Sequence, residues 1–261
     1  MTIYSIEANN MFNTEDLDKA REHFSEHRYA VIDNILLPKY IKELYKSVTT
    51  IDYGYWACNG ETHLKFNHNE DKNFKEIRDE YRDNAVDNFS YWHRAYWIHE
   101  DKHKQFSDRF PKTTEFTKVV TEDYEIRRPD TTFLELAETV SGFTNMYTEQ
   151  PSYSYYSYDN WLVPHHDPAR WLAYIFYFNP NWKAHWGGQL CIMNQDETTI
   201  KTSIEPFGNR LVLMDVSATS GKRINKHFIS PVSYIAPYPR YSLAGWFYQK
   251  DKNGPSPVDI T

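Results

Sequence analysis

Two residues in the second half of the chain, His165 and Asp167, have the spacing of a metal-ligand pair on a strand. Residues i and i+2 of a strand point to the same face, so this imidazole and this carboxylate can bind one ion from one side. A third ligand has to come from elsewhere, and His227 is the best candidate. Two histidines and one carboxylate leave the opposite coordination positions open, a ligand set that suits non-haem Fe(II). Because His-x-Asp also occurs by chance, its meaning depends on the residues downstream.

A second pair, near the end of the chain, is suited to an anion. Arg240 and Ser242 share the i, i+2 relation, so a guanidinium and a hydroxyl can contact one anion together. A guanidinium binds a carboxylate through two parallel hydrogen bonds, which suits Arg240 to hold one end of a dicarboxylate. Between the two pairs lie Asn-x-x-Trp at 179–182 and Gly-Gly-x-Leu at 187–190, and Gly-Trp-Phe follows at 245–247.

The composition is typical of a globular protein. The 261 residues are 40% hydrophobic and 17% aromatic, which is enough for a substantial core. The formal net charge of −7 argues against nucleic acid as a partner and permits a basic substrate. The two cysteines, Cys58 and Cys191, indicate a compartment with reduced thiols. No apolar run resembles a signal peptide or a membrane span, so we expect a soluble cytoplasmic protein without a membrane partner.

The first part of the chain favours helices and the last part favours strands. Helices are expected at 14–25, 38–48, 113–120 and 131–140. A strand is expected at 29–37, a strand or helix at 89–98, and a loop with some helix at 58–83. From residue 143 the pattern changes to short strands, expected at 153–158, 171–178, 189–194, 210–215, 226–229 and 241–249. Closely spaced short strands are typical of a barrel or jelly roll. We therefore expect one α+β domain with a mainly β core, in which residues 1–145 give helical support and residues 146–250 form the barrel.

In its order of motifs the chain resembles the prolyl-hydroxylase-like branch of the Fe(II)/2-oxoglutarate-dependent oxygenases, most clearly from residue 153 to 248. The resemblance implies a double-stranded β-helix, a jelly-roll or cupin-like barrel, with Fe(II) held by His165, Asp167 and His227. It also implies that 2-oxoglutarate binds the iron and directs its far carboxylate toward a pocket formed by Arg240, Ser242, Tyr177 and Trp246. The implied enzyme is a dioxygenase that uses O2 to hydroxylate an unactivated C–H bond while 2-oxoglutarate becomes succinate and CO2.

Several substrates remain open at this point. The first hypothesis is a prolyl or other residue of a protein or peptide, and the second is a free amino acid or small metabolite. A third hypothesis is a barrel that has lost catalysis and only binds a ligand, and the intact triad together with Arg240 argues against it. A radical halogenase is disfavoured because Asp167 fills the site that such enzymes leave to halide.

Other residues around the motifs have ordinary interpretations. His166 points to the face opposite its neighbours and is expected to be structural or solvent-facing. Arg170, Arg223 and Lys226 are expected either on the solvated surface or at the mouth of the site, where they would guide substrate. Residues 58–112 are rich in Trp, Tyr, His and charge. They are expected to form either a lid that contributes to substrate choice or a helical buttress outside the barrel.

Overall fold

The structure is a computed structural model. It describes residues 11–15, 17–51, 57–61, 91–97, 108–121, 132–148, 151–158, 160–167, 170–219, 222–223 and 225–249. Most of the segment expected to be a lid or buttress, including His63 and His68, lies outside the described residues. None of the described helices is long and apolar enough to cross a membrane.

Among the described residues, four helices lie before residue 145 and one short turn of helix follows later. They are α2 (Leu17–His27), α3 (Pro38–Thr49), α6 (Pro111–Thr121), α7 (Thr132–Ser141) and the 3-10 turn η3 (Ala184–Trp186). In α3, Pro38 occupies the first turn, where its missing N–H costs nothing. Leu44 and Val48, one turn apart, are the buried residues of α3. All four expected helices are confirmed, with ends shifted by a few residues.

Most described strands join one large sheet. They are β1 (Tyr29–Asp33), β2 (Ala57–Glu61), β3 (Tyr91–Trp97), β4 (Met146–Thr148), β5 (Ser152–Tyr156), β6 (Trp161–His165), β7 (Leu172–Tyr177), β8 (Leu190–Met193), β9 (Ile200–Ile204), β10 (Arg210–Asp215), β13 (His227–Ile229) and β14 (Arg240–Gln249). The order is β1-β10-β7-β14-β5-β3-β6-β13-β8-β9, with β2 beside β3 and β4 beside β14. The short strands β11 (Ala218–Thr219) and β12 (Lys222–Arg223) pair separately.

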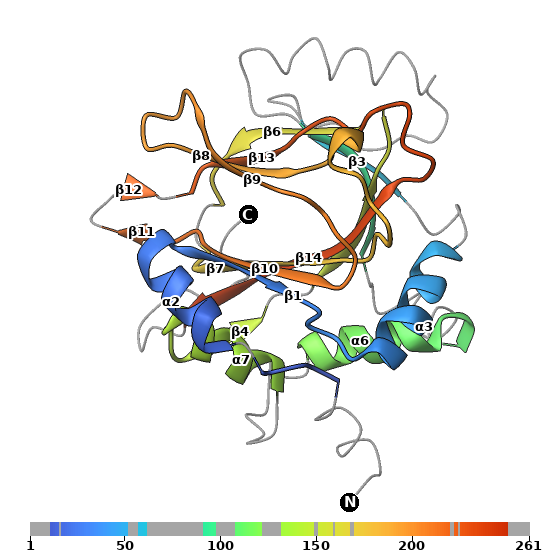
Figure 1. The fold of residues 1–261 in the computed structure, drawn as a ribbon, viewed down its shortest axis with the longest axis horizontal. Helices are drawn as coiled ribbons and strands as arrows, with labels where there is room; N and C mark the ends of the chain where they lie inside the picture. Colours follow the sequence, from blue (N-terminus) through green and yellow to red (C-terminus); the bar gives the residue numbers. More distant parts are fainter. Residues whose placement is uncertain are drawn as a thin grey trace, which may run out of the picture.

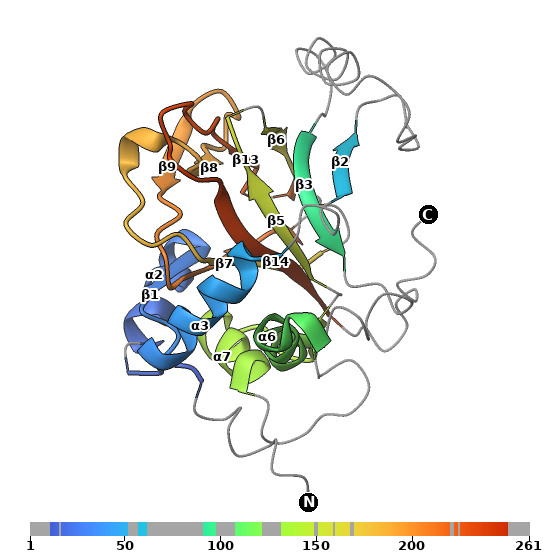
Figure 2. The same cartoon turned by 90° about the vertical axis from the view of Figure 1, so that its right-hand side faces the viewer.

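The large sheet folds over into two facing layers. In Figure 1 the layer of β1, β10, β7 and β14 lies below the layer of β6, β13, β8 and β9. Figure 2 shows β5 and β3 on the side that connects the two layers. The helices cover the outer face of the lower layer (Figure 1). Among the described strands β1 and β9 are the two ends of the sheet, so two facing layers are seen and no closed barrel.

Alternation along the strands divides the interior into two cores. In β10, Leu211 and Leu213 pack with the helices on the outer face, whereas Val212 and Met214 pack between the layers. Successive residues of a strand point to opposite faces, so a strand covered on both sides reads as a continuous apolar run. The chemistry-bearing residues of the C-terminal half lie around the inner core, which also contains Tyr177.

Several predictions about strands need correction. Residues 57–61, expected in a loop, form β2, and β9 was missed altogether. The strand expected at 29–37 ends at Asp33, because Asn34 adopts a positive φ of 56° that breaks the extended course. The prediction that His165 and Asp167 lie on one strand is wrong. β6 ends at His165, and Asp167 follows two residues beyond its end.

Candidate active site

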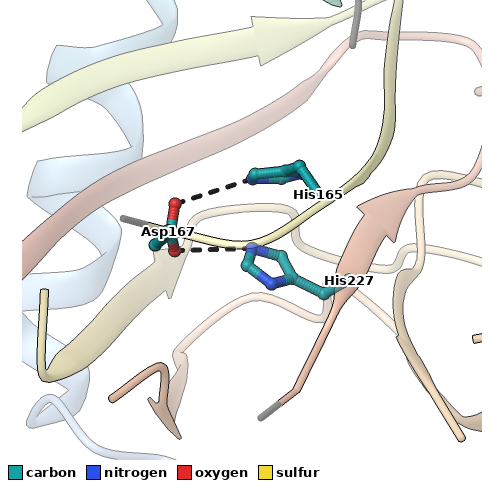
Figure 3. A group of neighbouring side chains, drawn as sticks. All are labelled: His165, Asp167 and His227. Atoms are coloured by element: carbon teal, nitrogen blue, oxygen red, sulfur yellow. Dashed lines mark ion pairs between the residues drawn. The ribbon is translucent and has the colours of Figure 1, made fainter. Parts of the chain in front are cut away.

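The strand ladder brings two histidines together. His165 ends β6 and His227 begins β13, and the two residues are direct partners in the antiparallel pairing. Their ring centroids lie 4.3 Å apart. Asp167 lies just beyond β6, and its carboxylate presents one oxygen to each ring (Figure 3). Both nearest distances, Oδ1 to Nε2 of His165 and Oδ2 to Nε2 of His227, are 3.6 Å. One ligand atom from each of the three residues lies within 4.8 Å of the others.

Backbone carbonyls determine which nitrogen of each ring faces the group. Nδ1 of His165 lies 3.0 Å from the carbonyl oxygen of Val163, and Nδ1 of His227 lies 2.9 Å from that of Asn225. A carbonyl oxygen only accepts, so each Nδ1 carries the proton and donates it. Each Nε2 therefore keeps its lone pair toward Asp167, the form in which a neutral imidazole binds a metal.

Burial and mutual contact set the charges of the group. Burial by itself would raise the pKa of Asp167, but its interactions with His165, His227 and Trp246 lower that pKa overall. Burial, with a further contribution from His165, lowers the pKa of His227 to about 4. At neutral pH the group therefore contains a carboxylate and a neutral His227, so these two ligands need not lose a proton before binding a cation. The donor set fits a divalent transition metal such as Fe(II).

Two further side chains hold the carboxylate of Asp167. Trp246 donates a hydrogen bond of 2.9 Å from Nε1 to Oδ2 of Asp167. The guanidinium carbon of Arg170 lies 3.9 Å from the centroid of the Trp246 ring, and its Nη1 lies 4.0 Å from Oδ1 of Asp167. Trp246 was expected to line the 2-oxoglutarate pocket. In the structure its indole nitrogen contacts the carboxylate of Asp167 instead.

A buried cation lies on the inner side of β14. Arg240 is only 1% exposed, and it donates to the hydroxyls of Ser242 at 3.2 Å and Tyr177 at 3.1 Å. Among the described residues its Nε has no hydrogen-bond partner, and the contacts of its guanidinium are neutral: the two hydroxyls and the rings of Tyr156 and Tyr177, whose centroids lie 5.0 and 4.8 Å away. A buried guanidinium is costly unless an anion pairs with it, so the pocket fits an anionic ligand.

The sheet register explains why these residues meet. Ser242 of β14 is the direct partner of Tyr177 on β7, and Arg240 precedes Ser242 by two residues on the same face. Burial raises the pKa of Tyr177, while the charge of Arg240 lowers it in part. The phenol therefore stays protonated at neutral pH. Because its oxygen accepts from Arg240, its own proton remains able to donate to a ligand.

The structure explains why the second residue of the Gly-Gly pair, Gly188, is a glycine. Its φ is +72°, and a Cβ built there would lie 3.0 Å from Cδ of Arg240 and 3.2 Å from a methyl carbon of Val232. Glycine adopts this conformation without steric cost, and its lack of a Cβ leaves room for the stem of Arg240.

Sequence reasoning missed Asn225. Its side-chain amide donates 2.9 Å hydrogen bonds to the backbone carbonyls of Arg28 and Asp215. Its backbone carbonyl accepts a hydrogen bond from Nδ1 of His227. Arg28 forms an ion pair with the buried carboxylate of Asp215. This network connects the region around β1 to His227, a candidate ligand. The available signal was an Asn two residues before a candidate ligand, because Asn tolerates the positive φ of 54° found there.

The remaining candidates lie outside the three-residue group. His166 and Lys226 both contact Glu197, a residue that sequence reasoning also missed. The side chain of Arg223 is not among those the structure describes.

Part of the chain is similar in sequence to a known family. Residues 151–248 match the family model of the 2OG-Fe(II) oxygenase superfamily. No curated protein sequence matches the chain.

Solved structures resemble this one along nearly its whole length. A Pseudomonas putida prolyl-4-hydroxylase has a TM-score of 0.56 at 15% identity, covering 90% of this chain and 99% of that chain. A Trichoplax adhaerens prolyl hydroxylase was solved in complex with a hypoxia inducible factor oxygen degradation domain peptide fragment. It has a TM-score of 0.55 at 16% identity, and the match covers 95% of this chain and 94% of that chain. A 2OG-Fe(II) oxygenase family oxidoreductase from Burkholderia pseudomallei has a TM-score of 0.54 at 8% identity. That match covers 92% of this chain and 94% of that chain. At such identities the likeness is one of fold, of the jelly-roll type.

Proposed function

We propose that this chain, a prolyl-hydroxylase-like member of the 2OG-Fe(II) oxygenase superfamily, hydroxylates a prolyl or other residue of a protein or peptide. Members of the superfamily are enzymes that use Fe(II), 2-oxoglutarate and O2. The observation that carries the proposal is the combination of the His-Asp-His group with a buried guanidinium, on the inner side of the same sheet, for which the described residues offer hydroxyls and aromatic rings but no carboxylate.

The metal-binding role falls to three side chains. His165, Asp167 and His227 would hold Fe(II), which when bound supplies the oxidising chemistry together with O2 and 2-oxoglutarate. The carbonyls of Val163 and Asn225 accept from Nδ1 and so direct each Nε2 toward Asp167, the side on which the metal would bind.

The co-substrate role falls to the residues around the buried cation. Arg240 would pair with the far carboxylate of 2-oxoglutarate, and the hydroxyls of Tyr177 and Ser242 would complete its hydrogen bonds. Pairing of this kind relieves the unfavourable burial of the guanidinium. It also fixes the position and orientation of the co-substrate, and positioning contributes to rate.

A peptide is favoured as substrate by analogy of fold. Two of the structures that resemble this chain are prolyl hydroxylases, and the Trichoplax enzyme was solved with a peptide fragment. The same fold can act on different substrates, so this support is weaker than the support for the metal and co-substrate roles. A free amino acid or small metabolite is the alternative.

The test supplies Fe(II), 2-oxoglutarate and O2 to the purified protein with either proline-containing peptides or free amino acids. We expect succinate formation to rise with peptide, and the peptide to gain the mass of one oxygen atom. Stimulation by free amino acids alone would favour the alternative. No succinate above the level of Asp167→Ala under any condition would contradict the proposal.

We also propose that the two facing layers form a double-stranded β-helix within a single domain. The family match and the facing order of the strands support this finer description. An experimental structure of the whole chain tests it.

A further inference from the structure

The hairpin that joins β8 to β9 ends in a rigid turn that carries Glu197. Asn194 closes the turn, since its backbone N–H donates to the carbonyl of Thr199 and its side chain donates to the hydroxyl of Thr199. The N–H of Glu197 in turn donates to the carbonyl of Asn194 over 2.9 Å. The turn therefore holds the backbone of Glu197 in a defined place.

The carboxylate of Glu197 bridges the neighbours of both histidines. Oε1 lies 3.0 Å from Nε2 of His166, the residue that follows His165. Oε2 lies 2.8 Å from Nζ of Lys226, the residue that precedes His227. One side chain thus connects β6, β13 and the β8–β9 hairpin, which are neighbours in the upper layer of Figure 1.

The backbone ladder between β6 and β13 is short at this end of the sheet, whereas β13 pairs with β8 along all three of its residues. β13 has three residues, and its pairing with β6 consists of His227 with His165 and Ile229 with Leu162, with a register shift between them. Within the described residues the ladder between these two strands ends at the histidine pair. Beyond that pair, the N–H of Met193 holds the carbonyl of Lys226 at 2.8 Å on the β8 side, and Glu197 supplies the contact between Lys226 and His166 on the β6 side.

The conformation of Glu197 is a second, independent observation. Its φ is 58°, in the left-handed region that most L-residues avoid. Five of the seven described non-glycine residues with positive φ are Asn, which tolerates this region; Glu197 and Arg28 are the exceptions. A Glu with a positive φ has an unfavourable backbone conformation, which the contacts of its side chain offset.

We propose that Glu197 is a positioning residue that sets the separation of His165 and His227 by holding His166 and Lys226. The inference rests on the proposed function, because it concerns the metal that these histidines would hold. The side chains of Glu197, Lys226 and His166 are 41%, 26% and 23% exposed. Partly exposed ion pairs contribute little to global stability. The effect is therefore expected in metal binding, where outer contacts commonly change affinity about 10–100-fold.

The test is anaerobic titration of metal-free protein with Co(II), followed by the visible absorption of the bound ion. Glu197→Gln keeps the shape of the side chain but retains a single acceptor oxygen. We expect it to weaken Co(II) binding about tenfold and to alter the absorption spectrum, with little change in the melting temperature of the metal-free protein. Glu205→Gln is the matched control, because Glu205 follows the other end of β9 and pairs there with Arg210. It removes the same charge and should leave binding unchanged.

Lys226→Met separates positioning from simple electrostatics. Removing a positive charge near a cation site should tighten Co(II) binding if only charge matters. Loss of the bridge should weaken it instead, and we expect weakening. Unchanged or tighter binding by Lys226→Met, or equal effects of Glu197→Gln and Glu205→Gln, would overturn the positioning role while leaving the proposed function standing. Wild-type protein that binds no Co(II) would overturn the proposed function and this inference with it.

Discussion

Trp246 donates the hydrogen of its indole Nε1 to Oδ2 of Asp167 across 2.9 Å. The bond joins β14 to the segment after β6, so a carboxylate outside any strand is held by a residue inside one. We expect Trp246→Phe to keep an aromatic ring beside Arg170 while losing the donor. A hydrogen bond to a charged group contributes about 1.5–3 kcal/mol, so metal affinity should fall by roughly tenfold or more. Co(II) titration measures this, and unchanged affinity would contradict the role.

Removal of a ligand should have a larger effect than removal of a residue that orients one. His165→Ala or Asp167→Ala deletes one of three protein ligands, and we expect loss of Fe(II) binding and of succinate formation. His185→Ala is the matched control, because His185 is exposed and lies outside the group. Full iron occupancy in either ligand variant would rule out the assignment.

The buried cation predicts how the co-substrate binds. Arg240→Ala should raise the KM for 2-oxoglutarate at least tenfold, since about 1.5–3 kcal/mol of charge-assisted hydrogen bonding is lost. Tyr177→Phe removes a neutral donor and should raise KM less. Steady-state kinetics with varied 2-oxoglutarate measures both values. If Arg240→Ala leaves KM unchanged, another cation such as Arg223 holds the carboxylate.

Gly188 offers a test of how closely Arg240 is packed. Gly188→Ala should raise the KM for 2-oxoglutarate severalfold, because the added Cβ would lie 3.0 Å from Cδ of Arg240. The backbone strain of alanine at positive φ also lowers stability by about 1 kcal/mol. Gly142→Ala is the matched control, since Gly142 has the same φ of +72° and nothing within 4 Å of the added Cβ. Both variants should lose similar stability, whereas only Gly188→Ala should change KM; equal KM values would contradict the packing argument.

The Asn225 network predicts a change in stability. Asn225→Gly tolerates the positive φ and removes both side-chain hydrogen bonds to the carbonyls of Arg28 and Asp215. The carbonyl of Arg28 keeps a 2.9 Å hydrogen bond from the backbone N–H of Asp215, so the cost falls mainly on the carbonyl of Asp215 and is about 1–3 kcal/mol. Urea unfolding of the metal-free protein should show a loss of that order. An unfolding free energy equal to that of wild type would mean that water replaces the amide at no cost.

Sequence reasoning located the strands that are buried on both faces and missed those with weaker signals. The apolar run of β10 is unmistakable, whereas β9 is mostly exposed and carries Lys and Thr. Pro164 within β6 argues against a strand by ordinary rules, and Asn59-Gly60 makes β2 resemble a turn.

The candidate site shows the same division. Spacing suggested that His165 and Asp167 meet and that Arg240 and Ser242 share a face, and the order of downstream motifs added His227; the structure brings both sets together. Their roles with iron and 2-oxoglutarate remain predictions. The contacts of Glu197 and Asn225 depend on register and on loop conformation. Neither register nor loop conformation produces a periodic pattern that can be read from a single sequence.

β1 has a consequence for any attempt to isolate the catalytic half. All five of its residues pair with β10, and Arg210 donates to both carboxylate oxygens of Asp33 at 2.6 and 2.9 Å. A fragment limited to the family-matched residues 151–248 would leave the apolar β10 with one side of its backbone unpaired. Such an edge recruits other chains, so the fragment should aggregate on expression. Adding back α2 and β1 as a separate peptide should restore solubility, and would make the protein a candidate for reassembly from two pieces.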